Sequence, residues 1–394
     1  MFAETLTITR PGTYTGTYES DDPDTPAISV RCDHGTVVIE HCTLSGVGNL
    51  IQTFDPAPHA IIIRDNRGRS AFSDRAGQLK GRFLLARKPR TLIVHNNDFR
   101  GTLGMRVHGV SPDYDGDDQI RIVRNRCLDV DGRRSDGSGG PTNEGRYKTS
   151  FFQLMDTPRT PNVVVAWNHV VNRPFESRVE DVVSMYRSGG TEDHPVDIAF
   201  NLIDGGYHGD AVDGRDFAGV GINTGDGPPD DEGRSMCGWT VARNNTVLNT
   251  GHGGISITSG SDITVRDNRV FSTSKVDGRY HQYGWAGIYV NNYHDTDPVE
   301  FQRHTVRNNV STWVFARDVM KPLWRRQDYL LLDDTIASDN RSHTPPGEEP
   351  DPDIADRERE RWRRSLVKAG ITTGPGGGIE RSSGGIEPDA SERR

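Results

Sequence analysis

The sequence predicts an all-β protein, a right-handed single-stranded parallel β-helix in which short strands wind into a solenoid. The first observation is that most of the short apolar runs end on an asparagine, replaced once by Cys42. These runs recur about two dozen to about forty residues apart, which matches one solenoid coil plus loops. The second is that no helical period of useful length interrupts them, which argues against a doubly wound α/β fold. The recurring asparagines are Asn66, Asn96, Asn125, Asn168, Asn201, Asn244, Asn268, Asn309 and Asn340.

The recurrence of asparagine has a physical reason in this fold. Equivalent side chains of successive coils stack at roughly 4.8 Å, and a polar group is tolerated inside only if its hydrogen bonds are satisfied along the stack. An asparagine amide both donates and accepts, and asparagine also tolerates the sharp turn conformation. We therefore interpret these residues as a structural ladder and not as catalytic groups.

Before and between the strands, the sequence indicates turns and insertions. The N-terminal segment has short strand-like runs separated by Pro-Gly and Asp-Pro turns and is expected to begin the first coil. Insertions between coils gather over one face of a solenoid and wall a binding groove. Four polar insertions cover residues 67–90, 129–148, 205–219 and 225–238. The third carries His208, Asp210, Asp213 and Asp216.

A change in composition near residue 342 divides the chain. We assign residues 1–342 to the β-helix domain and residues 343–394 to a charged, Pro/Gly-rich C-terminal tail. The tail opens with the breaker TPPGEEPDPD, and ADRERERWRRSLVKAG has the composition of a short charged helix. The Gly-rich remainder is expected to be poorly ordered.

Bulk properties limit the partners. A formal net charge of −9 argues against nucleic acid, which needs a basic surface, although it is compatible with a local arginine cluster that meets an acidic glycan. No apolar run has transmembrane length, so we expect no membrane partner, and the first residues do not begin a signal peptide. The four cysteines lack metal-ligand spacing.

The strand before each asparagine strand supplies the candidate binding face. Alternation along LGMRVHG, SFFQLMD, DVVSMYR, GVGINTG, GGISITS and AGIYVNN predicts an inward row of Val107, Leu154, Met185, Ile222, Ile257 and Val290. One outward column is then His108, Met155, Tyr186, Asn223, Thr258 and Asn291. The other is Arg106, Gln153, Ser184, Gly221, Ser256 and Tyr289. This polar and aromatic strip suits an extended carbohydrate. The expected substrate-binding residues on it are Arg106, His108, Gln153, Asn223, Tyr289 and Asn291.

The charged cluster in RVEDVVSMY is the most informative stretch. Arg178, Glu180 and Tyr186 share the outward parity, whereas Asp181 shares the inward parity. Because an unpaired buried carboxylate is costly, Asp181 is expected at the sheet margin or hydrogen-bonded inside. The cluster is either an ordinary surface pair or half of a site in which an arginine neutralises a substrate carboxylate.

A family resemblance follows from longer segments. GTYTGTYESDDPDTPAI, LDVDGRRSDGSGG, VVVAWNHVVNRP and above all SRVEDVVSMYRSGGT resemble bacterial right-handed parallel β-helix repeat proteins of the pectate-lyase-like superfamily, over roughly residues 5 to 340. The resemblance implies the fold, a polysaccharide or oligosaccharide partner and an extracellular or surface location. Six candidates lie in these segments or in the further matching segment INTGDG, namely Arg133, Asp136, Glu180, Asp181, Tyr186 and Asp226. The chain is expected to be a monomer or a homotrimer.

A second resemblance is looser. NTGDG, Asp230-Asp231 and GHGGISI, which contains His252, look like the motifs of polygalacturonases. The first aspartate is displaced by Thr224-Gly225, however, and GIYVNN stands where an R-I-K motif is expected.

The leading hypothesis from the sequence is a lyase that cleaves an acidic polysaccharide by β-elimination. In it Arg178 neutralises the uronate carboxylate and Tyr186 or His252 acts as the base. The acidic residues Glu180, Asp181 and Asp226 are expected to hold Ca²⁺ if the reaction needs a metal.

Two alternatives stay open at this point. One is a glycoside hydrolase that uses Glu180 and Asp226 as its paired carboxylates. The other is a non-catalytic β-helix that serves as a glycan-binding or structural module.

Overall fold

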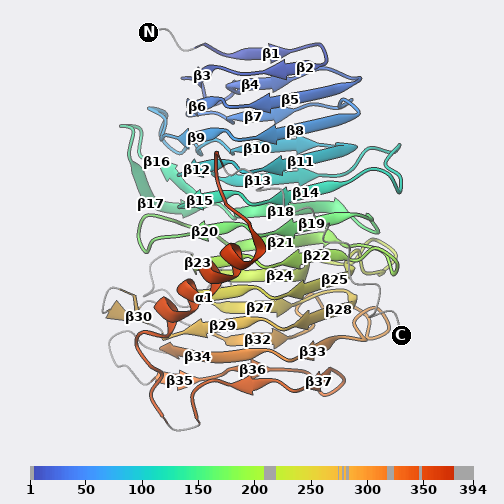
Figure 1. Cartoon of the computed structure of the whole chain (residues 1–394), viewed down its shortest axis with the longest axis vertical. Helices are drawn as coiled ribbons and strands as arrows, with labels where there is room; N and C mark the ends of the chain where they lie inside the picture. Colours follow the sequence, from blue (N-terminus) through green and yellow to red (C-terminus); the bar gives the residue numbers. More distant parts are fainter. Residues whose placement is uncertain are drawn as a thin grey trace.

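The computed structural model describes residues 4–207, 219–273, 275–276, 279–280, 284–316, 324–345 and 348–376. Within these ranges the chain forms a right-handed parallel β-helix, with three long sheets of 11, 11 and 12 strands wound around one core (Figure 1). Each coil contributes one strand to each sheet, so neighbours in a sheet are three or more elements apart in sequence, except that β35 pairs antiparallel with β34. The predicted fold class is confirmed.

The strands divide among the three sheets as follows. The first sheet contains β1 (Leu6–Ile8), β4 (Ile28–Val30), β7 (Ile51–Thr53), β10 (Leu84–Arg87), β13 (Gly104–His108), β18 (Ser150–Thr157), β21 (Asp181–Ser188), β24 (Val220–Asp226), β27 (Gly253–Ile257), β32 (Ala286–Val290) and β36 (Tyr329–Leu330). The second contains β2 (Gly12–Tyr14), β5 (Thr36–Glu40), β8 (Ala60–Arg64), β11 (Thr91–His95), β14 (Ile120–Val123), β19 (Val163–Ala166), β22 (Val196–Ala199), β25 (Gly238–Arg243), β28 (Ser261–Arg266), β33 (Thr305–Arg307) and β37 (Ile336–Ser338). The third contains β3 (Thr17–Ser20), β6 (Thr43–Gly46), β9 (Arg67–Ser70), β12 (Asp98–Arg100), β15 (Arg126–Leu128), β20 (His169–Val171), β23 (Leu202–Gly206), β26 (Thr246–Thr250), β29 (Arg269–Ser272), β34 (Val310–Ala316), β35 (Trp324–Arg326) and β38 (Arg341–Ser342).

Two hairpins project from the coils. The first pairs β16 (Arg133–Ser135) with β17 (Pro141–Arg146) inside the predicted insertion 129–148, and the second pairs β30 (Lys275–Val276) with β31 (Arg279–Tyr280). Both hairpins are antiparallel, in contrast to the coils.

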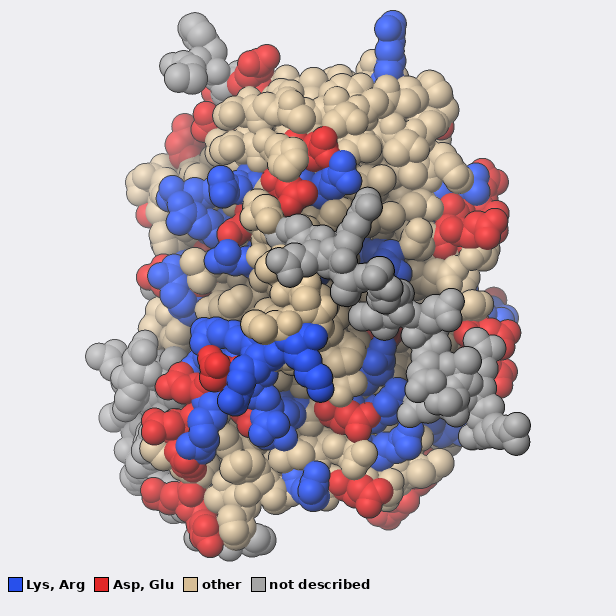
Figure 2. Space-filling view, viewed as in Figure 1, with Lys and Arg blue, Asp and Glu red and all other residues tan. Residues whose placement is uncertain are grey.

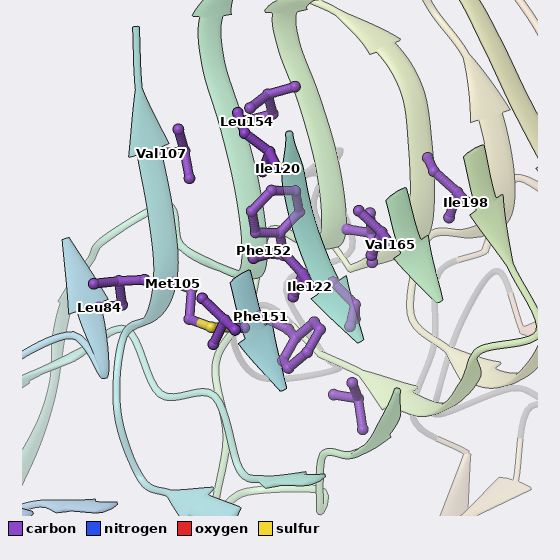
Figure 3. Packing of buried hydrophobic residues seen from close by; sticks show 14 of the residues in the cluster. Leu84, Met105, Val107, Ile120, Ile122, Phe151, Phe152, Leu154, Val165 and Ile198 are labelled. Carbon is purple, nitrogen blue, oxygen red and sulfur yellow. The ribbon is translucent and has the colours of Figure 1, made fainter. Parts of the chain in front are cut away.

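The core lies inside the solenoid, where apolar side chains from the three sheets meet (Figure 3). All six residues of the predicted inward row are buried. Phe83 and Phe99 stack with ring centroids 4.3 Å apart, and Phe151 continues the stack at 5.9 Å from Phe99. The alternating pattern therefore places its apolar members where the sequence predicts them.

The asparagine ladder runs along the turn between the second and third sheets. Each ladder amide donates from Nδ2 to Oδ1 of the asparagine in the next coil at 2.9–3.1 Å. The backbone N–H of each ladder asparagine donates to the same Oδ1, so the buried amides are satisfied within the stack. Cys42 takes the first place, and its N–H donates to Asn66 Oδ1 at 2.9 Å.

Two predicted ladder positions are wrong by one residue. Asn97 and Asn245 form the ladder, whereas Asn96 and Asn244 stand just before it with φ of 56° and 54°. The residue before each ladder position adopts this left-handed conformation, which asparagine tolerates well. Where two asparagines are consecutive, the second is the buried one.

A helix follows the last coil. Helix α1 (Ile354–Ala369) lies across the third sheet (Figure 1), and its buried Ile354 and Trp362 pack against Leu248 and Phe271. Trp362 Nε1 donates to the carbonyl of Phe200 at 2.7 Å. The helix expected after residue 342 thus packs on the solenoid. The described part of the chain has no helix that is long and apolar enough to cross a membrane.

Candidate functional site

A cleft of about 490 Å³ opens on the outward side of the first sheet. Six neighbouring strands form its floor, namely β13, β18, β21, β24, β27 and β32. Segments that flank these strands form its walls. The lining residues are Arg106, Lys148, Gln153, Met155, Glu180, Asp181, Tyr186, Val220, Asn223, Asp226, His252, Thr258, Trp285, Tyr289, Asn291, Tyr293 and His294.

The register of β24 differs from the predicted columns. Ser184 pairs with Asn223 instead of Gly221, and Tyr186 pairs with Asp226. The register shifts between these two pairs, so one extra residue of β24 bulges out of the ladder. The bulge puts Asp226 beside Tyr186, where the sequence places Asn223.

Two cations, Arg106 and Lys148, line the N-terminal part of the cleft, and Tyr147 and Arg82 adjoin Arg106 outside the lining. We call Arg82, Arg106, Tyr147 and Lys148 the basic end. Tyr147 Oη lies 3.4 Å from Arg82 Nη2 and 3.5 Å from Arg106 Nη1. Arg82 is buried, and its Nη1 donates to the Leu103 carbonyl at 2.9 Å. The phenol oxygen therefore lies between two guanidiniums, one of which lines the cleft.

This surrounding changes the acidity of Tyr147. Burial alone would raise the pKa of its phenol, but the charges of Arg82 and Arg106 outweigh burial and lower the pKa below its ordinary value. Burial also lowers the pKa of Arg82 to about 10, so Arg82 is still charged at neutral pH. Tyr147 is consequently easier to deprotonate than a tyrosine in water.

Lys148 extends the basic end toward the middle of the cleft. Its Nζ lies 2.9 Å from Glu180 Oε1, and the lysine side chain is 70% exposed, against 19% for the glutamate. An ion pair this open to water contributes little to stability. Lys148 thus places an exposed ammonium group at the edge of the cleft.

The C-terminal part of the cleft has the opposite character, and we call Asp181, Asn223, Thr258, Asp226 and His294 the acidic end. Asn223 Nδ2 donates to Asp181 Oδ2 at 3.3 Å, and Thr258 Oγ1 donates to Asn223 Oδ1 at 3.3 Å. Thr258 Oγ1 is also 3.5 Å from Asp226 Oδ1, which lies 2.8 Å from His294 Nε2. One chain of side chains thus connects the two aspartates.

The two aspartates differ in their surroundings. Asp181 is buried, and burial first and the charges of Glu180 and Asp226 second raise the pKa of its carboxyl well above the ordinary value. Asp226 is 18% exposed at its side chain and accepts the Gly227 N–H at 2.8 Å. Asp181 is therefore held neutral at a pH where an aspartate in water is charged.

Aromatic rings form the wall beside the acidic end. The His252 ring is stacked near Trp285 and meets Tyr289 edge-on, with both centroid separations at 6.0 Å. Trp285 and Tyr293 are 41% and 44% exposed, which is unusual for large apolar residues. Exposed aromatic faces at the rim of a polar cleft offer surfaces on which sugar rings can stack.

The structure brings ten of the sequence-predicted residues into the cleft. They are Arg106, Gln153, Glu180, Asp181, Tyr186, Asn223, Asp226, His252, Tyr289 and Asn291. Two buried polar atoms among them, Arg106 Nε and Gln153 Oε1, have no hydrogen-bond partner in the described part of the chain. Such atoms are suited to meet the hydroxyls of a ligand.

Arg178 does not line the cleft, in contrast to the prediction. It precedes β21 and forms a bridge with Asp131, and its N–H donates to the Val130 carbonyl at 3.0 Å. The alternation of β21 therefore does not extend back to Arg178, which is buried.

Arg133, Asp136 and His108 also lie outside the cleft lining. Arg133 forms a buried ion pair with Asp131, with Nε 2.8 Å from Oδ1. Asp136 is exposed in a turn and accepts the Ser138 N–H at 2.7 Å. His108 Nε2 lies 3.4 Å from Asp156 Oδ2, beyond the rim.

The sequence analysis missed several lining residues that flank strands of the first sheet. Lys148 comes just before β18 and follows Tyr147, which contacts the lining residue Arg106, and Trp285 comes just before β32. Tyr293 and His294 follow β32 closely. Proximity to a strand of the binding sheet would have found them. The acidic set of the third insertion, from His208 to Asp216, lies outside the described residues.

Binding of Ca²⁺ by Glu180, Asp181 and Asp226 stays a prediction. Glu180, Asp181 and Asp226 line the same cleft. In the described ranges, however, no three His, Cys, Asp or Glu side chains are arranged so that they could hold a metal ion.

Comparison with known proteins adds little to this geometry. No family model and no curated protein matches the sequence. The chain is similar to the solved structure of a mannuronic acid specific polysaccharide lyase of family 6 from the human gut microbiota, with 10% sequence identity and a TM-score of 0.46 over 94% of this chain and 90% of the other. The function must therefore be argued from the cleft itself.

Proposed function

We propose that the protein is a polysaccharide lyase that cleaves an acidic glycan by β-elimination at the basic end of the cleft. The observation that carries the proposal is the position of Tyr147 between Arg82 and Arg106, which lowers the pKa of the phenol. A base with a lowered pKa beside fixed cations is what abstraction of a proton next to a carboxylate requires.

The reaction has three linked events. Arg106 and Lys148 bind the uronate carboxylate and stabilise the negative charge that develops when the neighbouring carbon loses its proton. The Tyr147 phenolate takes that proton. The bond from the next carbon to the glycosidic oxygen breaks, a carbon–carbon double bond forms, and the Tyr147 phenol returns a proton to the leaving oxygen. No water is consumed.

The rest of the cleft would bind the neighbouring sugars. Gln153 and Asn223 present amide groups along the floor, and Trp285 and Tyr293 present ring faces at the rim. Binding by remote sugars orients the reacting one, which is an efficient way to lower the barrier.

Product analysis tests this proposal. Purified protein is incubated with polyuronates and with neutral polysaccharides, with and without a chelator, while ultraviolet absorbance and reducing ends are followed together. We expect absorbance to rise in step with reducing ends on a polyuronate alone, with the chelator present or absent. Complete loss of activity in chelator would contradict a mechanism based on side chains, and binding without any cleavage would leave only a glycan-binding role.

Hydrolysis is a second candidate, and the acidic end favours it. Asp181, whose pKa is raised, is connected through Asn223 and Thr258 to Asp226, and two such carboxyl groups have the form of a general acid and general base pair. In that reaction Asp181 would protonate the glycosidic oxygen while Asp226 activates a water molecule. Reducing ends without a rise in absorbance would select this candidate over elimination.

A further inference from the structure

A second concave region lies on the third sheet, away from the cleft of the first sheet. It has a volume of about 620 Å³ and crosses β6, β9, β12, β15 and β20. Four arginines line it, namely Arg67, Arg69, Arg100 and Arg126, and we call it the basic groove. Figure 2 shows Lys and Arg side chains gathered over these strands and over α1.

The arginines of the basic groove stand in register on adjacent strands. Arg69 pairs directly with Arg100, and Arg67 and Arg126 flank Asp98 on either side. Adjacent strands are about 4.8 Å apart, so Arg69 and Arg100 are close like charges, an arrangement that by itself costs stability. The register thus gives a row of cations along the solenoid axis.

One carboxylate, Asp98, lies among these four arginines. Arg67, Arg69 and Arg100 are exposed, and within the described ranges none of them has an ion-pair partner. Arg126 is 51% exposed and lies 3.7 Å from Asp98, which is a long contact. The groove therefore presents more positive than negative charge in a chain whose formal net charge is −9.

The C-terminal helix forms one side of the groove. His169, a groove residue, lies with its ring 5.2 Å from that of Trp362 in α1. Arg363 and Arg361 of α1 are 59% and 60% exposed, pair loosely with Glu360 and Glu358 of the same helix at 3.8 and 3.5 Å, and the charge of Arg363 reaches His169. After the helix, the chain returns past Arg126, which lies against Gly374. The helix thus enlarges the basic surface.

We propose that the basic groove is a second binding site for an acidic polysaccharide, separate from the catalytic cleft. The choice of ligand rests on the proposed function, because a chain that cleaves an acidic polymer on one sheet is exposed to that polymer on the others. Exposed guanidiniums bind carboxylates and sulfates through paired hydrogen bonds. A polymer held at two sites dissociates more slowly than one held at either site alone.

Other occupants fit the groove less well. Residues 377–394 of this chain carry four acidic and three basic residues, which gives little charge to complement the arginines. Nucleic acid would be repelled by the net negative charge of the whole molecule. An acidic polysaccharide of lower charge density meets less of this repulsion.

Charge reversal in the groove tests the proposal. The variant Arg69→Glu/Arg100→Glu is compared with Arg121→Glu/Arg307→Glu, which makes the same change at two exposed arginines of the second sheet. Equilibrium binding of polygalacturonate, dextran and duplex DNA is measured at low and high salt, together with cleavage of a short uronate oligomer. We expect the groove variant to bind polygalacturonate about tenfold more weakly at low salt and the control variant to change less than twofold.

The outcomes separate this proposal from the proposed function. If the groove variant binds the polymer more weakly and cleaves the oligomer at an unchanged rate, the result supports a second site. If it binds more weakly and neither the wild type nor either variant cleaves the oligomer, the result supports the second site and refutes the lyase. Equal losses in both variants, or no loss in either, overturn the basic groove as a site. If DNA binds more tightly than polygalacturonate and its binding depends on the same arginines, the ligand of the groove is nucleic acid and not a polysaccharide. If the double reversal fails to fold by circular dichroism, Arg69→Gln/Arg100→Gln is used, with an expected loss of about threefold.

Discussion

The two ends of the cleft lie along the same strip of the first sheet, but their surroundings shift the pKa values of their side chains in opposite directions. At the basic end, two guanidiniums lower the pKa of Tyr147 despite its burial. At the acidic end, burial and neighbouring carboxylates raise the pKa of Asp181. The comparison shows that the surroundings of a side chain can shift its pKa in either direction from the ordinary value. Each end defines a different reaction, so variants at the two ends discriminate between them.

The largest effect is expected at Tyr147. Tyr147→Phe removes the phenol oxygen that lies between Arg82 and Arg106 while keeping the ring, so elimination should fall about a hundredfold or more. Tyr186→Phe serves as the matched control, because burial and Asp226 raise the pKa of Tyr186 and make it a poor base. Steady-state rates on a polyuronate measure both. A larger loss of rate in the Tyr186 variant than in the Tyr147 variant would show that the base does not lie at the basic end.

A smaller effect is expected at Arg106. Arg106→Gln removes one of the two charges that lower the pKa of Tyr147 and one of the cations offered to the uronate carboxylate. We expect kcat/KM to fall about tenfold or more and the rise of rate with pH to move to higher pH, since a base with a higher pKa is deprotonated later. A pH–rate profile that keeps its position in the variant would separate Arg106 from the ionisation of Tyr147.

The variant Asp181→Asn distinguishes the two proposed reactions through its effect on activity, and it also changes the pH dependence of stability. If elimination occurs at the basic end, Asp181→Asn keeps cleavage within about tenfold, whereas a general acid would cost a hundredfold or more. Because the folded-state pKa of Asp181 is raised, the wild type loses stability as pH rises through that pKa, and the neutral asparagine avoids this loss.

Thermal unfolding at pH 5 and pH 9 measures the stability part of this prediction. We expect the free energy of unfolding of Asp181→Asn, relative to that of the wild type, to be higher at pH 9 than at pH 5 by ~1 kcal/mol or more. An equal difference at both pH values would show that Asp181 does not titrate in this range.

The smallest effect is expected at the aromatic rim. Trp285 is 41% exposed and stacks near His252, so its contribution is to bind sugars remote from the reacting bond. Trp285→Ala should raise KM about threefold to tenfold on a long polymer and leave kcat nearly unchanged. A loss in kcat with unchanged KM would assign the ring a part in the reaction itself.

The sequence predicts the solenoid and its core well because both depend on regular alternation. Each coil repeats the same inward row, and the ladder asparagines stand at the turn where a buried amide can be satisfied. The errors occur where alternation is interrupted. A bulge moves Asp226 beside Tyr186, and Arg178 belongs to a segment that bridges to Asp131 before β21 begins.

The site itself is only partly predictable. Residues on the strands, such as Gln153 and Tyr289, follow from parity, since a strand fixes the face of each side chain. Tyr147 and Lys148 stand at the end of a long polar insertion. The sequence does not say which part of an insertion returns to the sheet. The pairing of Tyr147 with Arg82 depends on residues 65 positions apart, a contact that the winding of the coils creates.

The measurement that tests the central claim most directly is mass spectrometry of the fragments that the wild-type protein releases from a polyuronate. Elimination consumes no water, so each new non-reducing end is lighter by one water than the end that hydrolysis would produce. We predict that every new non-reducing end carries this deficit. Fragments of full hydrolytic mass would contradict elimination at the basic end and assign cleavage to Asp181 and Asp226.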